Sequence, residues 1–383
     1  MLLVFAVASY AIAMLHGVPE KESSPADGGL IRLFAWTGIC FLLNDGLRNR
    51  IELLKVLRHI VMAGTLTACL GLLQFVTGSS LVDWMSIPGL NSADSISNID
   101  VRGDFVRAAG MASHPLEYGV VLAVSFPLAI TLAFTDTTKS WLAKWTPVCA
   151  IVCASALSVS RTALIATAVS FVALIPAWPK QRRRRAYVAI VLLLVGVYFI
   201  TPGMLGTLRG LFTFGSADSS INSRTESFSI AIEMVANNPI VGRGFGTFLP
   251  EYVIVDNQYL GLLVELGVLG VISFVSLIAA GLHCAKRARL VSVDEVMIQL
   301  SQAVLASLAA VGIAFAFFDG LSFPMAAAML FLILGVSGAL WRIVQEERAA
   351  LPAGKLDALT ARMTPGFRLL RPRREGVDDG PNA

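Results

Sequence analysis

Apolar and polar stretches alternate along the 383-residue chain, and ten of the stretches are apolar. They cover residues 1–16, 30–43, 60–77, 118–135, 146–160, 162–178, 186–202, 258–283, 300–318 and 321–341. Most of them approach the ~20 residues that an α-helix needs to cross a bilayer. The pattern therefore predicts an all-α, polytopic integral membrane protein of about ten transmembrane helices, in which the second and fifth stretches are short.

The composition is consistent with lipid as the solvent for much of the chain. Hydrophobic residues make up 56% of the sequence and charged residues only 15%, whereas about a quarter of the residues of soluble domains are charged. All five cysteines lie in or at the ends of apolar stretches, so we expect no disulfide framework. Neither a metal-ligand pattern nor a nucleotide-binding loop is found, and we expect no cofactor, metal or nucleic acid.

The basic residues predict the orientation. Of the 30 Lys and Arg residues, 22 lie in four polar segments and the C-terminal tail, at residues 44–59, 136–145, 179–185, 284–299 and 342–383. Cytoplasmic loops are enriched in Lys and Arg, so we expect a multi-pass protein of the bacterial inner membrane with both termini in the cytoplasm. Residues 1–343 then form the transmembrane domain, and residues 344–383 form a basic, disordered cytoplasmic tail.

Residues 146–178 are either one long helix with Arg161 in its middle or a helical hairpin. The hairpin keeps the Arg182–Arg185 cluster in the cytoplasm, so we favour it, and it places Arg161 at the outer tip. A charge near the membrane is costly and marks a functional candidate. The alternative is that Arg161 extends its side chain to the interface.

Two long outer loops follow from this topology, residues 78–117 and 203–257. In the second loop, Ser223 and Glu226 fit a capping box, and Phe228, Ala231, Ile232 and Val235 share one face of an amphipathic helix. We expect this helix to lie on the outer membrane surface or to cap the bundle.

Arg224 lies in the first turn of this predicted helix, where free N–H groups favour anions. It is either part of a phosphate site or a solvated partner of Glu226. The segment Gly242–Gly246 contains Arg243 and is either a turn that approaches a ligand closely or a tight re-entry turn.

Two helix starts carry further candidates. Asp256 and Asn257 precede the eighth apolar stretch, where Asp256 is either a proton acceptor at the membrane surface or an ordinary N-cap. Arg107, His114 and Glu117 gather at the start of the fourth stretch. A lone histidine there is more often structural than catalytic.

Four segments resemble the O-antigen ligase and polymerase family of bacterial membrane glycosyltransferases. The resemblance spans roughly residues 100–283 and is carried by RAAGMASHPLEYG (107–119), SVSRTALIA (158–166), RTESFSIAIEMVANNPIVGRGFGTF (224–248) and DNQYLGLLVELGVLG (256–270). The third and fourth segments together, with NPxxGxGxG followed by ELGxLG, are the most specific part.

The resemblance implies a metal-independent, inverting glycosyltransferase that takes a polyprenyl-diphosphate-linked oligosaccharide as donor at the outer face of the membrane. Arg161 and Arg224 match arginines that would hold the diphosphate, and Asp256 stands where ligases of this family usually carry a histidine base. Three catalytic residues are therefore expected, namely Asp256, Arg224 and Arg161. Four substrate-binding residues are also expected, namely Arg107, His114, Arg243 and Asn257.

The aspartate at position 256 makes a polymerase of O-antigen or exopolysaccharide the first choice, with a glycan as acceptor. The first alternative is a ligase that attaches the glycan to a lipid or another surface acceptor. The others are a transporter or flippase of lipid-linked glycans and a scaffold that binds polysaccharide-assembly proteins and membrane lipids.

Overall fold

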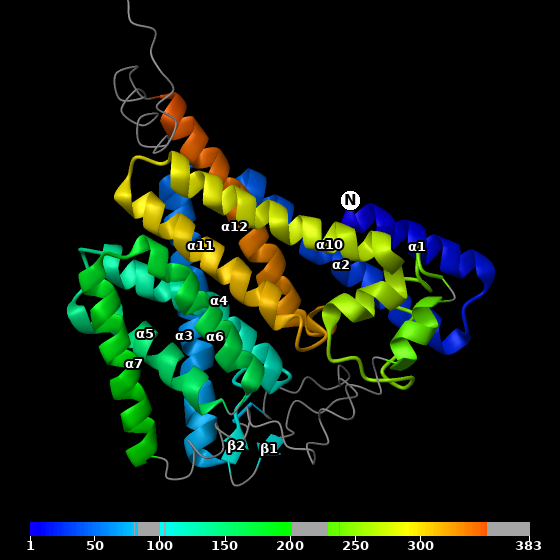
Figure 1. The fold of residues 1–383 in the computed structure, drawn as a ribbon, viewed down its shortest axis with the longest axis horizontal. Coiled ribbons are helices and arrows are strands. Elements are labelled where there is room, and N and C mark those ends of the chain that lie inside the picture. Colours follow the sequence, from blue (N-terminus) through cyan, green and yellow to red (C-terminus); the bar gives the residue numbers. More distant parts are fainter. Residues whose placement is uncertain are drawn as a thin grey trace, which may run out of the picture.

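The computed structural model describes residues 1–79, 81–82, 100–102, 105–158, 160–200, 229–236 and 238–350. Apart from one antiparallel pair of three-residue strands, its regular elements are helices (Figure 1). In chain order they are α1 (Leu2–His16), α2 (Glu20–Gly46), α3 (Arg50–Thr77), β1 (Asp100–Arg102), β2 (Phe105–Arg107), α4 (Pro115–Thr135), α5 (Trp141–Leu157), α6 (Arg161–Leu174), the 3-10 turn η2 (Ile175–Ala177), α7 (Lys180–Ile200), α10 (Gln258–Val291), α11 (Glu295–Ala314), the 3-10 turn η3 (Gly320–Ser322) and α12 (Pro324–Ala349).

The fold class is that of a multi-pass helical membrane protein. Within the described residues, six helices are long and apolar enough to cross a membrane, namely α2, α3, α4, α10, α11 and α12. Helices α1, α5 and α6 are apolar but shorter. Each of the ten predicted apolar stretches overlaps one helix, while the number of actual crossings stays a prediction.

Helices α4, α11 and α12 form the centre of the bundle, and α7 and α1 lie at its opposite edges (Figure 1). Small residues allow close helix crossings, as is usual in membranes. A Cβ on Gly71 of α3 would overlap the ring of Tyr118 in α4, and a Cβ on Gly119 of α4 would overlap Ala163 of α6. The two helix starts of α4 and α6 are thereby brought together.

Two predicted boundaries change in the structure. Helix α2 begins at Glu20, ten residues before the predicted apolar stretch, because its polar first turns pack against the outer loop and bury Glu22 and Ala26. Residues 146–178 form two helices, α5 and α6, as the hairpin interpretation requires. Helix α12 runs to Ala349, and the predicted tail beyond residue 350 lies outside the described residues.

The helix connections with many basic residues meet at one end of the bundle, which we call the basic end. It comprises the α2–α3, α4–α5, α6–α7 and α10–α11 connections. An ion pair joins Arg50 to Asp294, another joins Arg58 to Asp136 at 3.4 Å, and Arg289 donates to the Pro176 carbonyl at 3.4 Å. The basic segments of the sequence are thus neighbours in space.

The opposite end, which we call the site end, contains the starts of α4, α6, α10 and α12 and the end of α11. The Gln258 backbone N–H donates to the Phe315 carbonyl at 2.9 Å, and the Leu321 N–H donates to the Gln258 side chain at 2.5 Å. The Met325 N–H donates to the Glu117 carboxylate at 2.5 Å. These contacts fasten α4, α10 and the α11–α12 connection to one another.

Helix α10 is broken at Gly267, which has φ 63° and ψ −164°. A break exposes backbone groups that cannot be left unsatisfied in lipid, and the outer loop satisfies them. The N–H groups of Arg243 and Gly244 donate to the carbonyls of Val264 and Glu265 at 2.9 and 3.0 Å. On the other side of the break, the Val268 and Leu269 N–H groups donate to the Pro239 and Ile240 carbonyls at 2.9 and 3.4 Å.

These hydrogen bonds between the outer loop and α10 explain why the sequence segments 224–248 and 256–270 both contain glycines. A Cβ on Gly267 would overlap the Ile240 carbonyl, and a Cβ on Gly242 would overlap the Glu265 carbonyl. Both glycines have positive φ, at 63° and 73°. The tight re-entry turn predicted for residues 242–246 is therefore a backbone lock on the broken helix, which we call the α10 lock (residues 239–244 with 264–269).

Candidate functional site

The helix starts at the site end are capped by local side chains, which fixes where the candidate residues lie. His114 caps α4, Ser160 caps α6 and Asn257 caps α10. Asn257 accepts hydrogen bonds from the backbone N–H groups of Tyr259 and Leu260 at 3.0 and 3.2 Å. Capping satisfies N–H groups that the helix itself leaves without acceptors.

The N-cap interpretation of Asp256 is wrong, because Asn257 performs that role. Asp256 lies one residue before the cap and is partly buried. Its carboxylate is close enough to Asp319 to affect the ionisation of that group. The structure thus leaves the Asp256 carboxylate beside a second acid.

His114 has one ring nitrogen committed to the cap. Its Nδ1 accepts from the Leu116 backbone N–H at 3.2 Å, so the neutral ring carries its proton on Nε2. The ring lies against Phe323, with centroids 5.5 Å apart. His114 is therefore a structural cap whose Nε2 N–H is the group with which it could bind a substrate.

Arg107 ends β2, opposite Asp100 in the ribbon, and leads into the turn before α4. Gln74 of α3 holds this turn: its side chain accepts from the Gly110 N–H at 2.7 Å and donates to the Gly110 carbonyl at 2.9 Å. Arg107 is partly buried, and its Nε is shielded from solvent.

Arg161 is the first residue of α6, directly after the capping residue Ser160. The first turn of α6 touches the first turn of α4 at Ala163 and Gly119, so Arg161 and His114 lie at neighbouring helix starts. The Arg161 guanidinium is partly buried, with Nε shielded from solvent. It adds a fixed positive charge to the positive end of the helix dipole.

Arg243 has a partner inside the protein. It forms an ion pair with Glu22 of α2, a residue only 1% exposed, and lies over the Tyr252 ring with its guanidinium carbon 4.9 Å from the centroid. The Tyr252 hydroxyl donates to the same Glu22 oxygen. This arrangement ties the α10 lock to α2, and a substrate contact of Arg243 stays a prediction.

A cavity of about 220 Å³ opens at the site end between α2, the outer loop, the first turns of α10 and the α11–α12 connection. Its polar lining consists mainly of Arg32, Gln258, Glu265 and Asp319, and Trp36 adds an aromatic wall. Burial raises the pKa of the Asp319 carboxyl above its ordinary value, and the nearby Asp256 carboxylate adds to that rise. A hydrogen bond from Ser322 and the positive charge of Arg32 oppose it.

Glu265 is held by the α10 lock. The backbone N–H groups of Gly246 and Phe248 donate to its carboxylate, and its own carbonyl accepts from Gly244. The Glu265 side chain thus lines the cavity close to the break in α10, as Arg32 of α2 also does.

Arg32, Glu265 and Asp319 were not among the residues predicted from the sequence, although signals for two of them exist. Asp319 is the one charged residue between the apolar stretches 300–318 and 321–341, on the outer side by the predicted topology. Glu265 lies within an apolar stretch, where a charge marks a functional candidate. No pattern in the sequence marks Arg32, because its role depends on how α2 packs.

The amphipathic helix of the outer loop is described from residue 229 to residue 236. Ala231 is buried against Val255, Leu260 and Val264, so this segment caps the outer part of α10. Ile232, predicted on the same face, is exposed. Arg224 and the predicted capping box lie outside the described residues.

Comparison with known families identifies residues 146–275 with the O-antigen ligase family, which confirms the resemblance that the sequence motifs indicated. The matched region includes Arg161, Arg224, Arg243, Asp256 and Asn257 and excludes Arg107, His114 and Asp319. No curated protein sequence matches the chain.

Proposed function

We propose that this chain, an O-antigen-ligase-type membrane protein by its residues 146–275, transfers or polymerises glycans carried on a polyprenyl diphosphate at the outer face of the bacterial inner membrane. The family match supports glycan transfer in the membrane in general. The observation that carries the finer proposal is the electrostatic proximity of Asp256 to Asp319, which lines a cavity together with Arg32.

Arg161 and Arg224 are proposed to hold the diphosphate of the donor. A guanidinium presents two parallel N–H groups that match phosphate oxygens. Arg161 also stands at the positive end of α6. Positive groups placed there would stabilise the charge that develops on the leaving diphosphate.

The acid pair is proposed to take the proton of the acceptor. An acceptor hydroxyl oxygen bonds to the anomeric carbon, the bond from that carbon to the diphosphate oxygen breaks with inversion, and the hydroxyl proton passes to Asp256 or Asp319. A carboxylate with a raised pKa is a stronger base than an ordinary one. Asp319 has that property because of its burial and its acidic neighbour.

A polymerase remains our first choice, because Asp256 stands where ligases of this family usually carry a histidine. The ligase is the second candidate, and the description of the matched family favours it. The two differ in acceptor: a polymerase elongates donor alone into longer lipid-linked chains, whereas a ligase needs a separate lipid or surface acceptor.

Transport of lipid-linked glycans is not favoured by the break in α10. Broken helices in transporters present open half-helix ends to their substrate. In this chain the carbonyls of Val264 and Glu265 and the N–H groups of Val268 and Leu269 are already paired with the outer loop. The break is filled by the chain itself.

The test is glycan elongation by the purified protein with a synthetic polyprenyl-diphosphate oligosaccharide. The Asp256→Asn, Asp319→Asn and Arg161→Ala proteins should insert into the membrane normally but should not elongate the glycan chain. The matched control is Asp45→Asn, an exposed carboxylate at the basic end of α2, which should keep wild-type chain lengths. Wild-type elongation by both Asp256→Asn and Asp319→Asn would contradict the proposal.

A further inference from the structure

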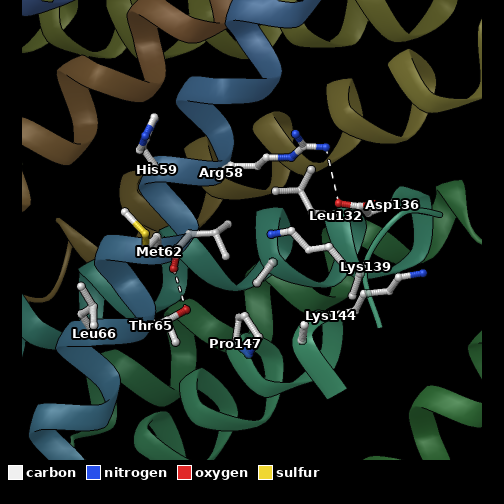
Figure 2. A pocket seen from close by; sticks show the side chains of 14 residues that line it. Arg58, His59, Met62, Thr65, Leu66, Leu132, Asp136, Lys139, Lys144 and Pro147 are labelled. Atoms are coloured by element: carbon white, nitrogen blue, oxygen red, sulfur yellow. Dashed lines mark hydrogen bonds and ion pairs between the residues drawn. The ribbon is translucent and has the colours of Figure 1, made fainter. Parts of the chain in front are cut away.

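The basic end contains a second cavity, of about 300 Å³, between α3, the end of α4 and the start of α5. Figure 2 shows that its lining has two parts. Charged side chains from three elements surround one side: Arg58 of α3, Asp136 and Lys139 of the α4–α5 connection, and Lys144 of α5. The other side is mostly apolar, although Thr65 and His59 of α3 also line it.

The charges of the rim do not cancel. Arg58 and Asp136 form an ion pair at 3.4 Å, and the Asp136 side chain is only 7% exposed. The Thr138 hydroxyl donates to Asp136 at 2.7 Å and, together with Arg58, keeps the pKa of that carboxyl below its ordinary value. Asp136 is therefore ionised and neutralises Arg58, while Lys139 and Lys144 have no carboxylate partner within the described part of the chain.

The apolar side of the cavity continues onto the exposed lateral surface of the helix bundle. Met62 and Leu66 of α3 are 55% and 61% exposed, and both line the cavity together with Leu132 and Pro147. Trp141, 70% exposed at the start of α5, is typical of the membrane–water interface. A ligand of this cavity thus meets positive charge at one end and lipid-facing apolar surface at the other.

We propose that this cavity binds an anionic glycerophospholipid of the cytoplasmic leaflet, with its phosphate between Lys139 and Lys144 and an acyl chain along Met62 and Leu66. Basic pockets between transmembrane helices at the cytoplasmic side recognise anionic headgroups. A soluble phosphate compound would use the two lysines but would leave the apolar side empty. This cavity lies at the basic end, whereas the proposed glycan transfer takes place at the site end. The lipid proposal therefore does not depend on the proposed function.

The test reconstitutes the full chain in phosphatidylcholine nanodiscs that contain phosphatidylglycerol, with pure phosphatidylcholine nanodiscs as the blank. Native mass spectrometry then counts the phosphatidylglycerol molecules that stay bound to the protein. The Lys139→Gln/Lys144→Gln protein should bind phosphatidylglycerol about thirtyfold more weakly, since each lysine beside the phosphate contributes about fivefold and the two factors multiply. The matched control is Lys286→Gln/Arg287→Gln, which removes two exposed charges of α10 that also lie at the basic end. This variant should bind phosphatidylglycerol as the wild type does. Arg58 is left unchanged because its loss would strand Asp136.

A second variant separates a seated lipid from general attraction to the surface. Ala143 lines the cavity and is exposed, so Ala143→Trp should fill the cavity without changing the charge and should also lose the bound phosphatidylglycerol. Equal losses in the two double variants, or undiminished binding by Ala143→Trp, would overturn the proposal. Displacement of the lipid by inorganic phosphate alone would overturn the lipid assignment as well.

Discussion

Asp319 is held in a place that costs folding free energy. A carboxyl whose pKa is raised on folding destabilises the folded state once it ionises, and that loss grows as the pH rises from the ordinary aspartate pKa towards the raised one. The causes in this protein are burial and the neighbouring Asp256, only partly offset by Ser322 and Arg32. Such a cost is typical of a residue retained for function.

We predict that Asp319→Asn makes the protein more stable and less active. The amide keeps an acceptor for the Ser322 hydroxyl but carries no charge, so the midpoint of thermal unfolding should rise at neutral pH. The rise should disappear below about pH 3.9, where the aspartate is protonated in both states. Glycan transfer should fall by about 10²–10⁴-fold, the usual contribution of a general base.

Thermal unfolding in detergent at the two pH values and the elongation assay measure these effects. Asp45→Asn, at the basic end of α2, should change neither the unfolding midpoint nor the rate of glycan transfer. A destabilised Asp319→Asn protein at neutral pH would show that the carboxylate is a structural group.

The ion pair of Arg243 with Glu22 allows a second test at the residue scale. Because Glu22 is buried and its other oxygen, Oε2, has no hydrogen-bond partner among the described residues, Glu22→Gln and Arg243→Gln should each destabilise the protein by about 1–3 kcal/mol. The double variant should lose little more than either single one. The control is Lys21→Gln, whose ion pair with Glu251 is exposed at 3.6 Å and should contribute at most ~1 kcal/mol.

Unfolding free energies from a double-mutant cycle provide the measurement. Additive losses would mean that Arg243 and Glu22 act independently and would favour the prediction that Arg243 is a substrate ligand.

At the residue scale, local patterns located the starts of α4 and α10 but not the roles of the residues there. The N-cap interpretation of Asp256 was wrong by one position, because Asn257 caps α10, and His114, a candidate substrate ligand, caps α4. The partner of Arg243 lies 221 residues away in the chain, and Arg32 lines the same cavity as Glu265 only because α2 packs beside the outer loop. Such pairings depend on tertiary packing that no local pattern contains.

At the scale of elements, the break in α10 is the feature that organises the site end. Apolar content predicted the helix, since the residues on both sides of the break are mainly apolar, with Glu265 as a charged exception. The break itself depends on Gly267 and on the outer loop segment that replaces the missing helical hydrogen bonds. The polar start of α2 was missed for a related reason, because only its contact with the same loop makes a helix favourable there.

We predict that Gly267→Ala disrupts this element. Its φ of 63° and the overlap of a Cβ with the Ile240 carbonyl should cost at least ~3 kcal/mol and reduce the folded fraction sharply. Gly261→Ala is the matched control: it lies in the same helix with nothing within 4 Å of a Cβ and should be neutral or stabilising by up to about 1 kcal/mol. Size-exclusion profiles and unfolding midpoints in detergent distinguish the two.

An equally well-folded Gly267→Ala protein would mean that α10 can be continuous and that the lock is dispensable.

On the scale of the whole molecule, the chain separates its charges between two ends. The connections that the positive-inside bias assigned to the cytoplasm do gather at one end, joined by Arg50–Asp294 and Arg58–Asp136. Three of the candidate residues, Arg161, His114 and Asp256, lie at the other end. The segregation by charge was predictable from the sequence, because it depends on alternation of helices and not on their packing.

We predict that the basic end faces the cytoplasm. With the five native cysteines replaced, a single Thr137→Cys in the α4–α5 connection should react with a membrane-impermeant maleimide only after cell lysis. Glu251→Cys in the outer loop, exposed as Thr137 is, should react in intact spheroplasts. Labelling of position 137 in intact spheroplasts would invert the topology and move the proposed glycan transfer to the cytoplasmic side.

The α10 lock has a consequence for biogenesis. During synthesis residues 239–244 emerge from the ribosome before residues 264–269, so the loop segment is available before the helix segment with which it pairs. Without the loop, unpaired carbonyls and N–H groups of the break would face hydrocarbon at several kcal/mol each. We therefore expect lateral release of α10 from the insertion machinery to require that residues 239–244 fold back onto the break first.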